Sequence, residues 1–391
     1  MRSFERTHPW IRFSVDLSSV STRFWLMLGE CQSKCDHLAR APLRPETAEQ
    51  LHQIYLAKGI LATTAIEGNT LTEEQVRQHV EGKLQVPVSK KYLQREVDNI
   101  LRACNGITDL VHSGRTPDLD LARVKGLNAQ VLKDLELAED VHAGEIRTHS
   151  VGIGNVYRGA PPEDCEYLLD RLCAWLNSDT FKPTDELREY AIAFALLRAV
   201  IAHLYLAWIH PFGDGNGRTA RLVEFQILIS SGVPAPGAHL LSNHYNATRT
   251  EYYRQLSLAS KSAGNALPFL SYAVQGFLDG LRQQLEFIWD QNYDVVWRNY
   301  VHETFRDKAG AANERRRHLI LDLSRQAAPV PRQRLSEIST RLAKAYARKT
   351  DKTLSRDVNI LRDMGLLEEE AKGYRAHKEL ILAFLPTTAR S

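Results

Sequence analysis

The sequence predicts a mainly α-helical protein with a short β-hairpin and a separate helical domain in its C-terminal part. Three observations support this fold class. Apolar residues make up 43% of the 391-residue chain, which is enough for a large buried core. Over most of the chain these residues recur at spacings of three and four, as they do on one face of a helix. The basic charge is confined to the last fifth of the sequence, which indicates a separate module there.

The charge distribution is uneven along the chain. Residues 310–391 contain 17 Lys and Arg against 10 Asp and Glu, a net charge of +7, which leaves residues 1–309 with a net charge of −4. Such asymmetry favours a nucleic-acid-facing module attached to a different kind of domain. The alternative is a basic but merely solvated tail.

No stretch of the sequence predicts a membrane span or a secretion signal. Arg198 and His203 interrupt the longest apolar run, 191–210, and charged residues occupy the first positions of the chain. The five cysteines form no metal-ligand pattern, and their odd number argues against a complete disulfide framework. We therefore expect a cytoplasmic protein that does not contact a membrane.

Residues 1–110 predict an N-terminal helical region. Apolar residues at helical spacing indicate a helix over 48–65. Gly68 and Asn69 can both adopt the left-handed backbone that ends a helix, and Thr72 with Gln75 is typical of the start of the next one. A tight turn between two helices is the expectation.

Residues 111–290 predict a central helical core that contains one hairpin. In the stretch 147–157, Val151 and Ile153 alternate with Gly152 and Gly154, which favours a short glycine-rich β-hairpin. A long apolar helix is expected over 185–209, and a second helix over 216–230. The turn between those two helices carries the strongest functional signal.

That turn has the residues of an anion site. Its glycines allow a ligand to approach the backbone, and it leads into a helix N-terminus, whose free N–H groups favour anions. Arg218 and Arg221, three residues apart, can face the same phosphate chain. Asp214 offers an oxygen ligand to Mg²⁺, and His210 is placed as a general base. The alternative is an ordinary interhelical turn. The full sequence of the turn and the start of the following helix is His210-Pro211-Phe212-Gly213-Asp214-Gly215-Asn216-Gly217-Arg218-Thr219-Ala220-Arg221.

This stretch resembles the signature of the Fic family at every specified position. The resemblance implies a Fic helical core that transfers AMP from ATP to a protein hydroxyl with Mg²⁺ as cofactor. It implies that His210 deprotonates the hydroxyl and that Asp214 holds the metal. It further implies an ATP-binding set formed by Gly215, Asn216, Gly217, Arg218, Thr219, Ala220 and Arg221.

Two other segments resemble Fic elements less specifically. The hairpin residues Val151, Gly152, Ile153 and Gly154 resemble the flap that holds the target protein by strand addition, with a purely structural hairpin as the alternative. The stretch 241–256 resembles the segment that follows the signature, and it places Tyr252 as a candidate adenine contact. Core packing of that aromatic ring is the alternative.

A third resemblance predicts a built-in inhibitor. Thr63, Glu67 and Gly68 fit the pattern (Ser/Thr)-x-x-x-Glu-(Gly/Asn) of the inhibitory helix in autoinhibited Fic proteins. A carboxylate at Glu67 would pair with Arg221 and occupy the position of the γ-phosphate. The alternative is a simple helix C-terminus.

Residues 310–391 resemble a winged helix-turn-helix domain. Helical patterns cover 314–327, 335–347 and a third segment that begins at 353, and Gly365 is placed to end the third helix before a two-stranded wing. The third helix would present its polar residues to a DNA major groove, with arginines of the first helix and of the wing contacting phosphates. The alternative is that the domain mediates protein contacts, as many such domains do. The polar residues of the third helix that would face the DNA are Lys352, Ser355, Arg356 and Asn359.

Together these features predict an autoinhibited protein adenylyltransferase that modifies a Tyr, Ser or Thr hydroxyl of a target protein, itself included. An alternative function is a nucleotide-responsive transcription regulator that uses the Fic core as a sensor and binds DNA through its C-terminal domain. A third hypothesis keeps the enzyme but changes the transferred group. The sequence leaves open whether the chain forms a homodimer.

Overall fold

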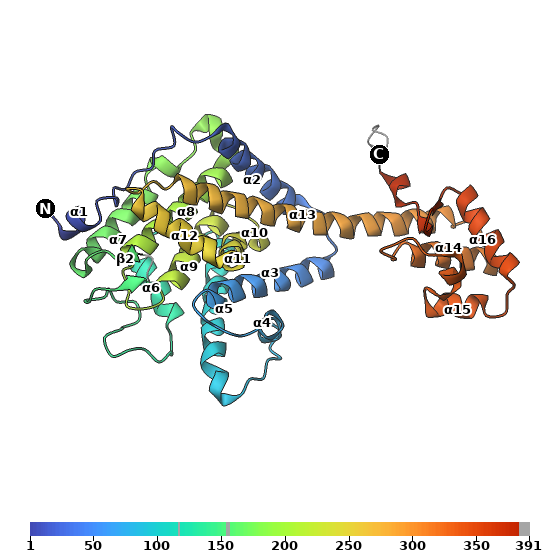
Figure 1. Ribbon diagram of the computed structural model, residues 1–391, viewed down its shortest axis with the longest axis horizontal. Helices are drawn as coiled ribbons and strands as arrows, with labels where there is room; N and C mark the ends of the chain where they lie inside the picture. Colours follow the sequence, from blue (N-terminus) through green and yellow to red (C-terminus); the bar gives the residue numbers. More distant parts are fainter. Residues whose placement is uncertain (116–117, 154–156, 383–391) are drawn as a thin grey trace. The chain divides into compact units, whose positions relative to one another are not determined.

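Helix α8 (Ala191–Ile209) is the central element of the fold (Figure 1). In the computed structural model, which describes residues 1–115, 118–153 and 157–382, almost every α8 side chain is buried. Helices α2, α7 and α9 pack against it. The segment 185–209 is long and apolar enough to span a bilayer, but 89% of its most apolar window is buried inside the protein. Its hydrophobicity is therefore accounted for by core packing.

The chain divides into two units, Met1–Glu286 and Phe287–Ser391, each with its own hydrophobic cluster. The expected N-terminal region 1–110 and the expected core 111–290 share the first cluster. Around α8, the first unit contains α1 (Ser3–Thr7), α2 (Thr22–Arg40), α3 (Pro45–Ala65), α4 (Glu73–Val80), α5 (Lys91–His112), α6 (Leu121–Val131), α7 (Pro162–Leu176), α9 (Asn216–Ser230), α10 (Ala235–Ala238), α11 (Leu240–Ala247) and α12 (Arg249–Lys261). Short 3₁₀ helices cover Val88–Lys90, Asp179–Phe181 and Asp185–Tyr190.

The turn between α3 and α4 forms as the sequence predicts, with one difference. Gly68 has a φ of +102°, and Thr72 caps α4 by accepting a hydrogen bond from the Gln75 backbone N–H at 3.2 Å. Asn69 does not adopt the left-handed backbone. Its side chain instead donates to the Leu93 carbonyl of α5 at 2.9 Å, so the turn is fastened to α5. This hydrogen bond holds the turn that follows α3 against α5.

The expected hairpin consists of β1 (Gly152–Ile153) and β2 (Tyr157–Arg158), which pair antiparallel. Their register places Gly152 opposite Arg158. Gly154, the last of the four expected flap residues, lies outside the described residues. The Ala160 N–H, just after β2, donates to the Trp208 carbonyl at 3.2 Å and so attaches the hairpin to the last turn of α8.

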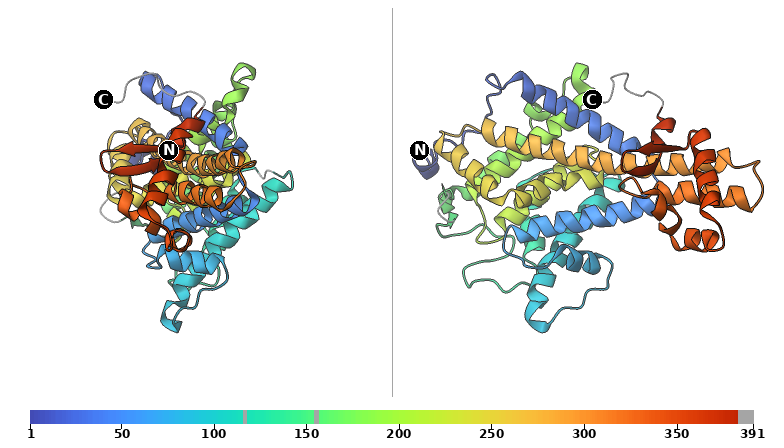
Figure 2. Two further views of the ribbon diagram at one scale, coloured as in Figure 1. Left: turned by 90° about the vertical axis from the view of Figure 1, so that its right-hand side faces the viewer. Right: turned by 45° about the vertical axis from the view of Figure 1, so that its right-hand side comes forward.

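The second unit contains the end of α13 (Leu267–Thr304), followed by α14 (Ala311–Leu323), α15 (Thr340–Tyr346), α16 (Asp351–Asp363) and the antiparallel strands β3 (Leu367–Glu370) and β4 (Gly373–Ala376). Two further 3₁₀ helices cover Arg332–Glu337 and Lys378–Ile381. The left view of Figure 2 shows β3 and β4 as dark-red arrows. Gly365, with a φ of +71°, ends the third helix as predicted. The predicted second helix is divided, because Ser339 interrupts it in an extended conformation and caps α15.

Several arginines of the basic second unit form ion pairs with carboxylates of the same unit. Arg315 and Arg316 of α14 both bind the buried carboxylate of Asp357, at 2.7 and 2.8 Å. Arg375 of β4 lies among Glu368, Glu370 and Glu379. These three arginines of the first helix and the wing therefore have internal carboxylate partners, and their contact with phosphates stays a prediction.

Candidate active site

The candidate site lies at the turn between α8 and α9. His210 ends α8 in the left-handed conformation, with a φ of +50°, and this backbone turns the chain sharply away from the helix axis. Gly215, with a φ of +75°, precedes the first turn of α9. Asn216 closes the loop between them, since its side chain accepts from the Phe212 N–H at 2.9 Å and donates to the Phe212 carbonyl at 2.8 Å. In this structure Asn216 holds the shape of the loop.

Two buried residues that the sequence analysis did not single out hold this loop. Asn128 of α6 donates to the Asp214 carbonyl at 3.0 Å and to Thr219 Oγ1 at 3.2 Å, and it accepts from the Gly144 N–H at 2.9 Å. Arg147 donates through Nε to the His210 carbonyl at 2.7 Å and through Nη2 to the Ala160 carbonyl. Arg147 thus joins the loop to the hairpin. Its remaining nitrogen, Nη1, also donates to a backbone carbonyl, that of His149, at 2.5 Å.

His210 is held in its neutral form. Burial lowers its pKa to about 4, and the positive charge of Arg147 acts in the same direction. The hydrogen bond to Ala207 and the charges of Glu67 and Asp214 oppose this shift without reversing it. A neutral imidazole can accept a proton at pH 7, so His210 has the protonation state that a general base requires.

Burial of neutral histidines predicts a pH dependence of stability. Burial also lowers the pKa of His239, to about 3. Below pH 6.5 the unfolded chain binds protons that the folded chain does not, so the free energy of unfolding should fall with decreasing pH by about 1.4 kcal/mol per pH unit for each histidine until its folded pKa is reached. Urea unfolding at pH 7 and pH 5 measures this effect. His239→Gln should reduce the difference, and an unchanged difference in the variant would contradict the assignment to His239.

The carboxylate of Glu67 lies in the anion cradle. Its Oε1 is 2.6 Å from Arg221 Nη2, and the same nitrogen donates to the Thr63 carbonyl at 2.9 Å. A Cβ atom at position 217 would stand 2.2 Å from Glu67 Oε1, so only glycine leaves room for this approach. The cavity beside Glu67 and His210 measures about 60 Å³. Ligand pockets usually measure ~300 Å³ or more, so this cavity is smaller than a usual ligand pocket.

Glu67 is ionised in this position. Its burial opposes ionisation, but the charge and the hydrogen bond of Arg221, with a smaller contribution from the charge of Arg218, outweigh that penalty and lower the pKa of Glu67 below its ordinary value. The contact between Glu67 and Arg221 is therefore a charge-assisted hydrogen bond, which is among the stronger polar interactions available to a protein.

Arg218 binds two carboxylates. Its Nη1 is 2.8 Å from Glu96 Oε1 of α5, and its Nη2 is 3.0 Å from Asp214 Oδ1. The Arg218 side chain is only 5% exposed, whereas that of Asp214 is 52% exposed. Both arginines of the turn thus have carboxylate partners, and Glu96 is a partner that the sequence analysis missed.

The residues present fit a magnesium ion that is shared with phosphates. Within residues 1–115, 118–153 and 157–382, no group of three or more His, Cys, Asp or Glu side chains could hold a metal by itself. Mg²⁺ is commonly held by one or two carboxylates together with substrate phosphates. Asp214 offers one accessible carboxylate beside the cradle, which matches that pattern.

Tyr252 lies in the wall of the cavity and is 4% exposed. Its hydroxyl is 2.8 Å from His203 Nε2, and His203 Nδ1 is 3.0 Å from Glu224 Oε2. The predicted nucleotide contact and the predicted core packing are therefore both compatible with its position, because the ring packs in the core and also borders the site.

The hairpin lies beside His210. The Gly159 N–H donates to the Val151 carbonyl at 3.2 Å, and a Cβ atom at position 159 would stand 3.1 Å from His210 Cβ. The base of the predicted flap thus contacts the predicted general base. Gly152, in β1, is exposed.

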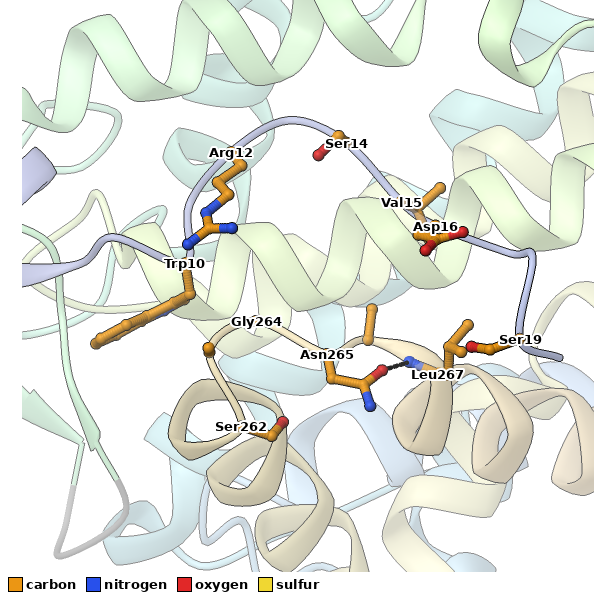
Figure 3. A pocket seen from close by; sticks show the side chains of 12 residues that line it. Trp10, Arg12, Ser14, Val15, Asp16, Ser19, Ser262, Gly264, Asn265 and Leu267 are labelled. Carbon is orange, nitrogen blue, oxygen red and sulfur yellow. Dashed lines mark hydrogen bonds between the residues drawn. The ribbon is translucent and has the colours of Figure 1, made fainter.

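A second, polar pocket of about 300 Å³ lies between the N-terminal segment and the turn that joins α12 to α13 (Figure 3). Arg12 and Asp16 line one side of it. On the other side, Asn265 Oδ1 accepts from the Leu267 N–H at 3.1 Å. No histidine is among the residues that line this pocket, so the turn between α8 and α9, which carries His210, is the better candidate for catalysis.

Residues 118–228 match the model of the Fic/DOC family. The matched segment contains α8 and the turn that follows it. It is 28% identical to the protein adenylyltransferase fic-1 of Caenorhabditis briggsae over 273 residues, which cover 69% of this chain and 47% of that protein. The protein adenylyltransferase Fic of Nematostella vectensis is also 28% identical, over 64% of this chain and 53% of that protein. The chain spans about half the length of the curated relatives it matches.

Solved structures share the fold. A Fic family protein from Desulfovibrio desulfuricans G20 superposes with a TM-score of 0.55 at 19% identity, over 92% of this chain and 97% of that one. Fic-1 from Caenorhabditis elegans superposes with a TM-score of 0.54 at 25% identity, over 69% of this chain and 74% of that one. The chain therefore contains a segment that matches the Fic/DOC family model, and it is similar, at 28% identity, to proteins named protein adenylyltransferase.

The Fic signature alone does not contain all the residues that the structure brings together at the site. His210, Asp214 and Arg221 lie on the turn after α8 and on the start of α9, and Glu67 reaches Arg221 from the turn after α3. Asn128, Arg147 and Glu96 come from α6, the hairpin region and α5. Each is a common residue type in an unremarkable local pattern, so only the tertiary structure reveals its contact.

Proposed function

We propose that this protein transfers AMP from ATP to a hydroxyl side chain of a target protein and that Glu67 inhibits the transfer in the resting state. The observation that carries the proposal is the pairing of Glu67 with Arg221 inside the glycine cradle, next to a neutral His210. The adenylyltransferase names of the relatives support the same reaction class.

The geometry supports a role for each group in the reaction. His210 would take the proton of a Tyr, Ser or Thr hydroxyl, whose oxygen forms a bond to the α-phosphorus of ATP. The bond from that phosphorus to the bridging oxygen breaks, and pyrophosphate leaves with the bonding electrons. The N–H groups of the first turn of α9 and the guanidinium groups of Arg218 and Arg221 would face the phosphates. Asp214 would hold Mg²⁺, which neutralises phosphate charge when it is bound.

The inhibition is a competition between two anions for one cradle. Glu67 is ionised and bound to Arg221, so the phosphates of ATP must displace it before they can reach the α9 N-terminus. Displacement costs the charge-assisted contact and requires the end of α3 to move. The hairpin beside His210 would then receive the backbone of the target, since an exposed strand can pair with an extended segment of another protein.

Mass spectrometry of the protein itself tests the proposal. After incubation of the Glu67→Gly variant with ATP and Mg²⁺, we expect a covalent adduct with the mass of AMP minus water on a hydroxyl residue of this chain or of an added protein. An adduct with the mass of a phosphoryl or pyrophosphoryl group would show that another group is transferred. Binding of ATP without any adduct would favour a nucleotide sensor instead.

We also propose that the second unit is a winged helix-turn-helix domain. The order α14, α15, α16 and a hairpin supports this, and Val330 adds a further β-bridge to Tyr374 of β4, with N–H to carbonyl distances of 2.8 and 2.9 Å. Lys352, Arg356 and Asn359 share an exposed face of α16. A helix in that position of the motif reads the DNA major groove in proteins that bind DNA.

Removal of the exposed cations of α16 tests DNA contact. Lys352→Ala combined with Arg356→Ala should weaken binding to duplex DNA and reduce the slope of log affinity against log salt by about 2, one for each lost phosphate contact. Lys182→Ala combined with Arg188→Ala removes the same charge from the first unit and is the control. Equal affinities for the two double variants would favour a protein-binding role for the second unit.

A further inference from the structure

Glu96 lies between the arginine Arg218 of the anion cradle and the turn that carries Glu67. It lies on α5, outside the Fic signature and outside the inhibitory pattern. Its Oε1 is 2.8 Å from Arg218 Nη1, and its Oε2 is 2.8 Å from Asn69 Nδ2. One carboxylate therefore binds an arginine of the cradle with one oxygen and the turn that carries Glu67 with the other.

The contact with Asn69 reaches the inhibitory carboxylate through a short and well-bonded segment. Asn69 is 6% exposed, lies two residues after Glu67, and its backbone N–H donates to the Thr64 carbonyl at 3.2 Å. Its Nδ2 also donates to the Leu93 carbonyl at 2.9 Å, and its Oδ1 accepts from the Leu71 N–H at 3.0 Å. The turn cannot move away from the cradle without breaking these bonds.

The contact with Arg218 determines which way this guanidinium faces. Arg218 is almost fully buried, and Glu96 and Asp214 are its carboxylate partners. A buried cation that loses one carboxylate turns to the other, because an unpaired charge is costly inside a protein. Arg218 already shares Asp214 with the proposed metal site, and without Glu96 Asp214 would be the carboxylate partner left to it, so Arg218 would compete more strongly for that carboxylate.

We propose that Glu96 is a positioning residue for the nucleotide site, fixing one end of the Arg218 guanidinium while Asp214 binds the other, and that its bond to Asn69 fixes the inhibitory turn. This inference rests on the proposed function. It assigns to one side chain of α5 both the orientation of an arginine of the cradle and the attachment of the segment that blocks the cradle.

The first experiment uses Glu96→Gln in the Glu67→Gly background, where the inhibition is absent. Gln keeps the shape of Glu but lacks its charge, so Arg218 loses a charge-assisted hydrogen bond. We expect the KM for ATP and the half-saturating Mg²⁺ concentration to rise about 10-fold, with a smaller change in kcat. Calorimetric ATP binding by the Glu67→Gly, His210→Ala form should weaken by the same factor.

The matched control is Asp98→Asn, which also removes a carboxylate from α5. Asp98 binds Arg102 at 2.6 Å on the side of α5 away from Arg218. If Glu96→Gln and Asp98→Asn change KM and ATP binding equally, Glu96 is only structural and the positioning role is overturned. If Glu96→Gln folds poorly, Glu96→Asp replaces it, since it keeps the charge but shortens the side chain. Its KM for ATP should lie between that of the parent and the 10-fold increase expected for Glu96→Gln.

The second experiment uses Asn69→Ala, which cuts the attachment of the turn and leaves Glu96 with Arg218. We expect the rate of AMP transfer to rise about 5-fold when Glu67 is present, which corresponds to a coupling free energy at the low end of the usual range. The gain should disappear in the Glu67→Gly background. An equal effect in both backgrounds would overturn the link between Asn69 and inhibition. Absence of AMP transfer in Glu67→Gly itself, despite ATP binding, would instead refute the proposed function.

Discussion

Replacing Glu67 by glycine is expected to raise the rate of AMP incorporation about 100-fold, because displacing a carboxylate from the buried guanidinium of Arg221 costs ~3 kcal/mol and ATP no longer bears that cost in the variant. In the structure the Glu67 carboxylate is 2.6 Å from Arg221 and lies against Gly217, where a phosphate would have to bind. Glycine also removes the bulk that keeps the cavity at about 60 Å³. Both the charge and the volume of the obstacle disappear in one substitution.

The measurement is the initial rate of AMP incorporation at fixed Mg²⁺ over a series of ATP concentrations. Glu81→Gly is the matched control, since Glu81-Gly82 repeats the Glu-Gly sequence at the end of α4. Glu81 pairs on the surface with Lys83 at 2.8 Å and does not contact the cradle. Equal rates for wild type and Glu67→Gly, with both folded, would show that the Glu67–Arg221 pair does not inhibit the enzyme.

Replacing His210 by alanine in the Glu67→Gly background is expected to lower kcat about 1,000-fold, within the usual range for loss of a general base. The neutral imidazole, held by burial at a pKa of about 4, can accept the hydroxyl proton, and alanine cannot. ATP affinity should change little, because the cradle consists of the α9 N-terminus and the two arginines.

His112→Ala is the control for this second substitution, since His112 is exposed at the end of α5. Rate and ATP affinity must be measured separately, so that loss of the base can be told from loss of binding. A His210→Ala variant that binds ATP and still transfers AMP at more than a tenth of the parental rate would rule out His210 as the base.

Much of this site could be predicted because its chemistry is local in sequence. The stretch from His210 to Arg221 joins a helix end, a glycine turn and a helix start within twelve residues, so the base, the anion site and the metal ligand fall together whatever the rest of the fold does. The inhibitory contact could be predicted only through the family resemblance, because Glu67 and Arg221 are far apart in the chain. Their contact at 2.6 Å agrees with that prediction.

The residues that support the site could not be predicted in this way. Asn128, Arg147 and Glu96 act through backbone groups or through other side chains, and no local pattern distinguishes them from other polar residues of helices and loops. The charge of the second unit shows the same limit. A count of residues gives a net charge of +7 for 310–391, but the pairing of Arg315 and Arg316 with Asp357 appears only in the folded structure.

The central claim is that this protein transfers the AMP part of ATP and that Glu67 prevents it from doing so. The most direct measurement compares incorporation of ATP labelled at the α-phosphate with ATP labelled at the γ-phosphate, in wild type, Glu67→Gly and Glu67→Gly with His210→Ala. We expect protein-bound label from the α position only, strong in the single variant and absent from the double variant. Label from the γ position, or equal α label in all three proteins, would contradict it.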